Sequence, residues 1–379
     1  MHTGHLTNVQ PCAHANRTSA TFSDRRAFLK ACGVAAAAAG LDTELAAKVA
    51  GAVSAPDRPP VVWLHFQECT GCTESLLRTS KPAVQELILE LISLDYHETL
   101  AAAAGHQLEE NLHKVMTEHD GGFILVVEGA IPTKDGGIYC KVGGKTAADS
   151  LEQAASKAAA VIAIGSCASF GGVAAAPPNP TGAVGVPALI QNKAVITLPG
   201  CPPNPYNLLS TVLHYLTFGK LPALDDKGRP LFAYGRTIHE HCPRRPHFDA
   251  GRFANAYGDE GHRAGWCLYE LGCKGPQTYA SCSTNHFCEV VGAWPIGIGH
   301  PCVGCTEDGI AFQIPMHDTI EIPAPTSRAQ HAPIDAQFRG RNGISPISTG
   351  FAGLVGGVLI GIALMAAKEL ADKDKSEGV

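Results

Sequence analysis

The sequence has few charged residues for a chain of 379 residues. Asp, Glu, Lys and Arg make up 17% of it, and the formal net charge is -6. A nucleic-acid-binding surface needs an excess of basic residues, so the composition indicates no nucleic-acid partner. The sequence also lacks a Walker loop, a zinc-finger spacing of Cys and His, and a Gly-x-Ser-x-Gly elbow. These absences argue against nucleotide-hydrolysing, zinc-finger and α/β-hydrolase functions.

Cysteine, by contrast, is abundant, with 14 residues in the chain. A disulfide scaffold is typical of short chains that cannot form a core, whereas this chain has several long apolar runs. Cys-x-x-Cys occurs twice, at Cys69/Cys72 and at Cys302/Cys305. Two thiolates at that spacing can bind one metal centre from a single loop. The pattern therefore favours metal or cluster ligation over a set of disulfides.

Residues 1–55 resemble a twin-arginine export signal. Arg25 and Arg26 are followed by Ala-Phe-Leu-Lys and an apolar stretch, and Val53-Ser54-Ala55 is a small-residue cleavage site. Cys12 and Cys32 belong to this leader, which leaves 12 cysteines in the mature chain. An ordinary amphipathic helix is the alternative. Twin-arginine export moves folded proteins, so a protein whose iron–sulfur clusters are assembled in the cytoplasm can cross in this way.

A second targeting feature lies near the C-terminus, where residues 347–367 carry no charge. A bilayer core of ~30 Å needs about 20 apolar helical residues, so this segment predicts a transmembrane anchor. Gly353, Gly357 and Gly361 form a small-residue stripe that favours close packing against another membrane helix. A buried helix of the soluble fold is the alternative. Residues 316–346 are the predicted linker and 368–379 a cytoplasmic tail, with the main domain on the periplasmic side.

Residues 56–219 predict an α/β domain with a parallel sheet. Four continuously apolar runs predict strands at Val61–Phe66, Phe123–Val127, Val161–Ile164 and Ala194–Leu198. Helical segments lie between them, such as Lys81–Leu94 and Ala147–Ala160. Alternation of this kind is typical of a sheet that is covered on both faces, whose ligands bind beyond the carboxyl ends of the strands.

Four cysteines directly follow three of these predicted strands. Cys69 and Cys72 follow the first strand, Cys167 the third and Cys201 the fourth, whereas the second ends in Glu128. They should therefore converge on one edge of the sheet, with glycines beside them that let backbone N–H groups approach the sulfurs. A flavin-binding domain is the competing interpretation, but cysteines occupy the position of its phosphate loop. The sequence thus predicts one four-iron cluster here.

Residues 220–315 predict a loop-rich, cysteine-rich domain with two further sites. The first site comprises His239, Cys242, Cys267 and Cys273, which could hold zinc or a four-iron cluster. The second comprises Cys282, Cys302 and Cys305, where Pro295 cannot ligate, and it suggests a three-iron cluster. Cys288 lies close enough to Cys282 to be a further ligand. A free thiol is the more ordinary interpretation of Cys288, as it is of Cys140.

Together these motifs resemble, in order and over almost the whole chain, the small subunit of membrane-bound nickel–iron hydrogenases. The resemblance implies a flavodoxin-like domain whose proximal four-iron cluster is bound by Cys69, Cys72, Cys167 and Cys201. It implies a distal four-iron cluster on His239, Cys242, Cys267 and Cys273, which replaces the zinc alternative with iron. A medial three-iron cluster would bind Cys282, Cys302 and Cys305.

The resemblance also implies the reaction and the partners. Hydrogen would be split at a nickel–iron centre in a separate large subunit, so no catalytic residue is expected in this chain. Electrons would pass through it to a membrane cytochrome b and quinone, as in an uptake hydrogenase or hydrogen:quinone oxidoreductase; a dimer of heterodimers is possible. Glu68 and Thr70 would lie near the large subunit and could move protons, although a structural role for Glu68 is the alternative.

One departure from part of the family concerns oxygen. Oxygen-tolerant members carry extra cysteines at the position of Gly71 and a few residues after Cys167, where residues 168–176 here contain none. The resemblance therefore implies an ordinary four-cysteine proximal cluster. Two rivals remain: a one-cluster subunit similar to that of quinone reductases, which lacks residues 220–315, and a membrane-tethered zinc or disulfide scaffold.

Overall fold

A computed structural model describes residues 58–80, 82–88 and 92–322. The first part of this chain forms a five-stranded parallel sheet in the order β2-β1-β3-β7-β9, which is the strand order of flavodoxin. Its strands are β1 (Pro60–His65), β2 (Ser93–His97), β3 (Ile124–Glu128), β7 (Ala160–Ile164) and β9 (Val195–Leu198). The predicted α/β domain with a parallel sheet is therefore confirmed.

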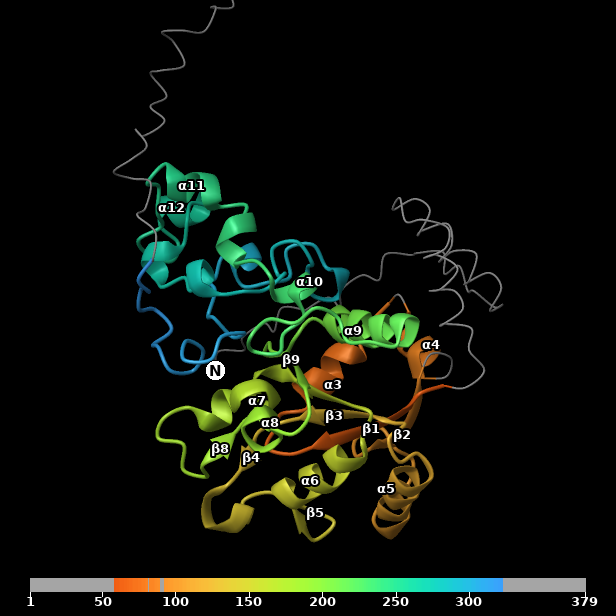
Figure 1. Cartoon of the computed structure of the whole chain (residues 1–379). Helices are drawn as coiled ribbons and strands as arrows, with labels where there is room; N and C mark the ends of the chain where they lie inside the picture. The colour runs from red at the N-terminus through yellow and green to blue at the C-terminus, as the bar shows by residue number, and fades with distance from the viewer. Residues whose placement is uncertain (1–57, 81, 89–91, 323–379) are drawn as a thin grey trace, which may run out of the picture.

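Helices cover both faces of this sheet (Figure 1). They are α3 (Gly71–Leu76), α4 (Val84–Glu86), α5 (His106–Glu118), α6 (Ala147–Lys157), α7 (Gly165–Phe170), α8 (Val186–Leu189) and α9 (Pro205–Phe218). Two small two-stranded sheets join β4 (Ile131–Pro132) to β8 (Ala183–Val184) and β5 (Lys141–Val142) to β6 (Lys145–Thr146). Short 3-10 turns are η2 (Lys134–Gly137) and η3 (Gly172–Ala175).

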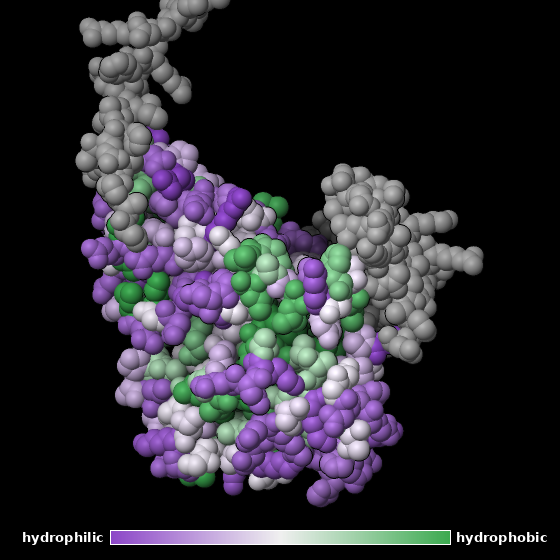
Figure 2. Space-filling model, in the orientation of Figure 1, coloured by the Kyte–Doolittle hydropathy of each residue, from purple (hydrophilic) through white to green (hydrophobic). Residues whose placement is uncertain are grey.

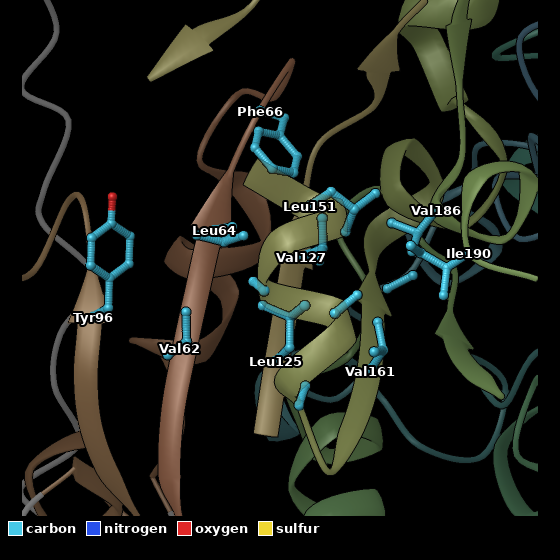
Figure 3. Close-up of a cluster of buried hydrophobic side chains, with 14 of the residues drawn as sticks. Val62, Leu64, Phe66, Tyr96, Leu125, Val127, Leu151, Val161, Val186 and Ile190 are labelled. Atoms are coloured by element: carbon cyan, nitrogen blue, oxygen red, sulfur yellow. The ribbon is translucent and has the colours of Figure 1, made fainter. Parts of the chain in front are cut away.

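Alternate residues of each strand enter two separate hydrophobic cores, because successive side chains of a strand point to opposite faces. Val62, Leu64, Leu125 and Val127 pack with Leu151 of α6 on one face (Figure 3). On the other face Val61, Trp63, Ile124 and Val126 pack with Leu76 of α3 and Leu208 of α9, and these side chains form the second core. Burial on both faces explains why these strands read as continuous apolar runs.

Helix ends follow local sequence signals. Thr146 accepts a hydrogen bond from the backbone N–H of Asp149 (3.2 Å) and caps the start of α6. Asn204 caps α9, Pro205 opens it, and Gly219 ends it at a φ of 63° that favours glycine. Helix α9 exposes the apolar side chains of Leu213 and Phe218. Helix α10 (Leu231–Tyr234) exposes two more, and apolar residues gather over both helices in Figure 2.

One predicted helix is confirmed only in part. Helix α4 (Val84–Glu86) lies within the predicted segment Lys81–Leu94, but Ser93 already begins strand β2. This strand lies at the edge of the sheet and pairs with β1 alone, with a register shift between Val61 and Val62. An edge strand has no need for a continuous apolar run, so its polar sequence concealed it. The helix predicted at Ala147–Ala160 corresponds to α6.

Residues 220–322 contain no strand and no helix longer than five residues. Their elements are α10 (Leu231–Tyr234), η4 (Ile238–His241), α11 (Arg245–Asp249), α12 (Glu260–Arg263), η5 (Tyr269–Leu271), η6 (Gly275–Gln277), η7 (Phe287–Glu289) and η8 (Ile296–Ile298). This loop-rich part packs beyond the edge of the sheet where α7 and α9 begin (Figure 1). The predicted export signal and anchor lie outside the described residues, within which no helix is both long and apolar enough to cross a bilayer.

Candidate cysteine-lined metal centres

The first site lies at the carboxyl edge of the sheet, where the sequence predicted it. Cys69 and Cys72 lie between β1 and the first turn of α3, Cys167 lies in α7 after β7, and Cys201 follows β9. Burial raises the pKa of the Cys72 thiol well above its usual range, and Glu128, Cys167, Cys201 and Cys69 raise it further. The structure therefore brings all four sulfurs together.

Two glycines allow the chain to pass close to these sulfurs. A Cβ at Gly165 would lie 2.5 Å from Cys72 Sγ, and a Cβ at Gly172 would lie 2.9 Å from Cys167 Sγ. Both glycines have positive φ, at +83° and +50°. Only glycine fits these positions, and the resulting cradle suits a group bound through four thiolates, as an iron–sulfur cluster is.

The same edge is open on one side. Cys69 and Cys201 are exposed, whereas Cys72 and Cys167 are partly buried. An exposed pair of thiols in an otherwise buried edge leaves a cluster accessible from outside the chain. A partner that covers Cys69 and Cys201 would complete the site.

A buried acid, Glu128 at the end of β3, supports this edge from below. Only 1% of its surface is exposed, and it accepts hydrogen bonds from Trp63 Nε1 (3.1 Å), from the N–H of Cys72 (3.0 Å) and from the N–H of Thr73 (3.2 Å). Thr73 Oγ1 donates to it as well, at 2.6 Å. Glu128 thereby fixes the start of α3 and the backbone of Cys72. The sequence located an acid here but did not reveal this role.

Glu68 and Thr70, the predicted proton-path residues, contact each other beside the first site. Thr70 Oγ1 donates to Glu68 Oε1 at 3.3 Å, and His65 Nδ1 lies 3.6 Å from the same oxygen. Burial, followed by the charge of Glu128, raises the pKa of Glu68, while His65 opposes the shift. Two buried histidines that the sequence did not reveal lie here, since the rings of His65 and His97 are 4.5 Å apart.

The second site is a pocket in the loop-rich part. His239, Cys242, Cys267 and Cys273 all line one pocket, together with Arg244 and Arg245. Burial, and then Arg245, lowers the pKa of His239 to about 4, so its imidazole is neutral and can ligate a metal. Gly275 N–H donates to Cys273 Sγ at 3.4 Å. The pocket and its donors fit a cluster bound by one His and three Cys.

The third site, formed by Cys282, Cys302 and Cys305, is deeply enclosed. Burial and then Cys282 raise the pKa of Cys305 to about 12, and burial, Cys273 and Cys305 raise that of Cys302 well above its usual range. The three sulfurs therefore lie together. Burial raises the pKa of Cys288, Arg78 lowers it and Glu289 raises it, and neither charged group belongs to the third site.

Cys140 and Pro295, which the sequence analysis also singled out, take structural places. Cys140 packs against the sheet core and belongs to none of the three groups. Pro295 accepts a hydrogen bond from the N–H of His300 at 2.8 Å. Across residues 58–80, 82–88 and 92–322, no three His, Cys, Asp or Glu side chains lie close enough to hold a single metal ion. Cluster ligands need not meet that condition, because each binds a different iron atom.

The three sites lie in a row. At one junction the backbone N–H of Cys201 is directed at the thiolate of Cys305, which in turn raises the pKa of Cys201 after partial burial. At the other junction Cys302 and Cys273 interact, and the N–H of Lys274 donates to the carbonyl of Cys302 at 2.8 Å. The order is therefore sheet edge, enclosed site and pocket.

Two family models match different parts of the chain. Residues 69–215 match the family described as NADH ubiquinone oxidoreductase, 20 Kd subunit, and residues 234–317 match the C-terminal family of NiFe/NiFeSe hydrogenase small subunits. The first family corresponds to the rival interpretation of a one-cluster subunit similar to that of quinone reductases. The second match covers the part of the chain that such a subunit lacks.

Individual relatives match over more of the chain. The Hydrogenase-2 small chain of Escherichia coli K12 is 55% identical over 357 residues, which are 93% of this chain and 95% of that one. The quinone-reactive Ni/Fe-hydrogenase small chain of Wolinella succinogenes is 48% identical over 75% of this chain and 80% of its own. A crystal structure of the reduced, active Ni-Fe-Se hydrogenase of Desulfomicrobium baculatum superposes with a TM-score of 0.66 at 34% identity, covering 70% of this chain and all of that one.

Proposed function

The chain belongs to the small subunits of nickel–iron hydrogenases, and we propose that it relays electrons from a nickel–iron large subunit through three iron–sulfur clusters to an acceptor in the membrane. The observation that carries this proposal is the row of three cysteine groups, which runs from the open sheet edge through the enclosed site to the pocket. A relay needs such closely spaced sites, whereas a structural zinc or disulfide scaffold has no need of a row. Each bound cluster would accept and release one electron.

The ligand assignment follows the three groups. The proximal four-iron cluster would be held by Cys69, Cys72, Cys167 and Cys201, the distal four-iron cluster by His239, Cys242, Cys267 and Cys273, and the medial three-iron cluster by Cys282, Cys302 and Cys305. Support comes from the shared surroundings of each set: the glycine cradle, the common pocket and the mutual effect on thiol pKa values. The chain contributes burial and hydrogen-bond donors, which set cluster potentials.

The large subunit would dock on the open edge of the sheet. Cys69 and Cys201 are exposed in this chain, and a partner that covers them would exclude water from the proximal cluster. Glu68 and Thr70 lie at the same edge, and the raised pKa of Glu68 suits a carboxyl that gives and takes protons. This arrangement supports a proton path there alongside the electron path.

Electrons would leave from the distal pocket toward the membrane. The acceptor we propose is a membrane cytochrome b that passes electrons to quinone, and the Wolinella succinogenes relative is named as quinone-reactive. The sequence patterns of residues 1–55 and 347–367 support folded export by the twin-arginine route and anchoring with the main domain in the periplasm. A dimer of heterodimers would fit the glycine stripe of the anchor.

Iron, sulfide and partner analysis tests this function. The purified complex should contain about eleven iron atoms per small subunit, a nickel-containing large subunit, and a paramagnetic three-iron signal in the oxidised state. Four irons without a three-iron signal would indicate the one-cluster subunit instead. Zinc with no visible absorption would contradict the relay altogether.

A further inference from the structure

Arg229 is a buried cation outside the cysteine groups. Only 4% of its surface is exposed, and its guanidinium bonds Glu307 Oε1 (2.6 Å) and Asp225 Oδ2 (2.7 Å). It also donates to the carbonyl of Thr306 at 3.3 Å. A buried ion pair is weak support for stability, because desolvation offsets the attraction between the charges. Its location therefore matters more than its strength.

The guanidinium lies where three cysteine-bearing loops meet. It stacks on Tyr234 (5.7 Å to the ring centroid), whose hydroxyl donates at 2.8 Å to the carbonyl of Pro199, two residues before Cys201. It also stacks on Tyr279 (5.6 Å), three residues before Cys282. Tyr279 N–H donates to Glu307 Oε1 at 2.9 Å. Glu307 follows Cys305 by two residues. The Arg229 side chain therefore links, directly or through Tyr234, the loops that carry Cys201, Cys282 and Cys305.

The turn that carries Arg229 is fixed to the sheet. Thr197 of β9 donates its N–H to the carbonyl of Gly228 (2.9 Å) and its hydroxyl to the carbonyl of Lys227 (2.8 Å). Lys227 Nζ adds a second ion pair to Glu307 at 2.8 Å. A Cβ at Gly228 would lie 2.6 Å from the carbonyl oxygen of Val195, so the turn is held tightly against the strand. The turn that carries Arg229 is therefore tied to strand β9.

Direct contacts also join the first and third sites, among them the N–H of Cys201 directed at the Cys305 sulfur. Ser166, next to Cys167, donates its hydroxyl to the carbonyl of Cys305 and accepts from the N–H of Gly200 at 3.0 Å. These contacts orient Cys305 but leave the rest of its loop to outer support. The bonds from Arg229 to Thr306 and Glu307 supply that support.

We propose that Arg229, paired with Glu307, is a positioning residue for electron transfer. It holds the Cys302–Cys305 loop at a fixed distance from Cys201, and so fixes the proximal-to-medial step. The rate of electron tunnelling falls steeply with distance, so a small displacement of this loop slows transfer without changing the clusters themselves. This inference rests on the proposed relay function, and it adds a residue that touches no cluster.

The test uses Arg229→Lys in the complete complex with its large subunit. Lysine keeps the charge but lacks the planar fork that binds Asp225 and Glu307 together and stacks on both tyrosines. After rapid mixing of the oxidised complex with hydrogen and freezing at set times, electron paramagnetic resonance follows the loss of the three-iron signal and the reduction of the four-iron clusters. We expect medial reduction to slow by about tenfold, equivalent to about 1.4 kcal/mol in activation free energy, while proximal reduction keeps its wild-type rate.

Leu151→Ala provides the matched control for stability. Leu151 is fully buried against the far face of the sheet, so its truncation lowers the unfolding temperature away from the three sites. It should leave the ratio of medial to proximal reduction rates unchanged. A changed ratio in this control would mean that lost stability explains the Arg229 result, and would overturn the proposal.

Other outcomes are equally decisive. Wild-type medial reduction in Arg229→Lys overturns the proposal, as does equal slowing or joint loss of proximal and medial signals, which would indicate a general folding role. Selective loss of the three-iron signal from the oxidised variant also overturns it, because Arg229 would then be needed to hold the medial cluster and not to set the rate of transfer. Arg229→Met, which removes the charge, should show a larger effect of the same kind. Failure of the relay function itself would be seen separately, as absence of the three-iron signal from the wild-type complex.

Discussion

The hydrophobic cores of the sheet half and of the loop-rich half differ in the residue types that form them. On each face of the sheet, apolar side chains of strands and helices form a hydrophobic core, as Leu125 and Leu151 do on one face. The single core of the loop-rich half includes Cys273 and Cys302, with Cys242 and Cys282 packed against it. In the second half, therefore, the residues that would hold the clusters are also the residues that form the core.

This difference separates two ways of placing a ligand. The sheet delivers Cys69, Cys167 and Cys201 to one edge because the carboxyl ends of parallel strands meet there, whatever binds between them. In residues 220–322 no sheet or long helix fixes the positions of the cysteines. We infer that the sheet half is stable by hydrophobic burial alone, while the loop-rich half needs its bound clusters to keep its fold.

Removal of the iron–sulfur clusters is the strongest way to break this comparison, and should give the largest effect. In cluster-free protein, produced under iron limitation, we expect residues 234–317 to lose most of their protection from amide hydrogen exchange. Strands β1, β3 and β7 should keep theirs. Equal loss of protection in both halves, measured peptide by peptide by mass spectrometry, would show that the sheet depends on the clusters too.

Truncation of the sheet core sharpens the comparison from the other side. Leu125 is fully buried, so Leu125→Ala should lower the free energy of unfolding by about 2–5 kcal/mol through lost burial and a residual cavity. Denaturant unfolding followed by circular dichroism measures this change. The folded variant should retain its iron content, because Leu125 lies near the start of β3 and the cysteines of the first site lie at the carboxyl edge of the sheet.

Its control is Ile138→Ala, at an apolar residue that is 57% exposed in the same half. That change should stay within about 0.5 kcal/mol of the wild type. A loss of iron in the Leu125→Ala variant would contradict the independence of the two halves.

The sheet could be predicted from sequence because full burial leaves a clear pattern. The apolar runs at residues 61–66, 123–127, 161–164 and 194–198 match β1, β3, β7 and β9 to within one residue at each end. From those strands alone the convergence of Cys69, Cys72, Cys167 and Cys201 followed, since strand ends meet at one edge. Strand β2 was missed because it is an edge strand with polar residues at Ser93 and Asp95.

The contacts that join the two halves could not be predicted in this way. Arg229 and Glu307 are 78 residues apart and both lie in loops, so neither periodicity nor a motif connects them. The pocket shared by His239 and Cys267 likewise depends on how the loops fold over each other. Burial of Glu128 was equally hidden, because an acid at a strand end is usually solvated.

Replacement of Glu128 tests how firmly the sheet half holds its own cysteines. Glu128→Gln keeps the shape but removes the charge that accepts hydrogen bonds from Trp63, Cys72 and Thr73. Hydrogen bonds to a charged group contribute about 1.5–3 kcal/mol, and we expect a loss of unfolding free energy in that range. The proximal four-iron signal should change shape or potential, while the three-iron signal should not.

Measured by redox titration with paramagnetic resonance, equal changes at both clusters would contradict this local role. Glu74→Gln is the matched control, because Glu74 lies in the same helix α3 but is exposed. It should leave both signals and the free energy of unfolding as in the wild type.

The smallest expected effect concerns acid and the buried histidine of the sheet half. Burial, and then the neighbouring His65, lowers the pKa of His97 from 6.5 to about 3. Its Nδ1 accepts from the N–H groups of Thr99 (3.2 Å) and Leu100 (3.3 Å), which requires the neutral ring. In the unfolded chain His97 is protonated below about pH 6.5, whereas in the folded chain it is protonated only below about pH 3. Stability is therefore complete above pH 6.5 and is lost as the pH falls through this window.

Between pH 6.5 and pH 5.5 this linkage should lower the free energy of unfolding by about 1 kcal/mol. His97→Asn removes the titrating ring, so its unfolding free energy should depend less on pH in this range, whatever its absolute value. His113→Asn, at an exposed histidine of α5, should keep the wild-type slope. If the slope survives in His97→Asn when followed by hydrogen exchange in β1 and β2, the acid sensitivity arises elsewhere. Loss of the clusters to acid in the loop-rich half would then be the source, and the stability of the sheet half would depend on the clusters after all.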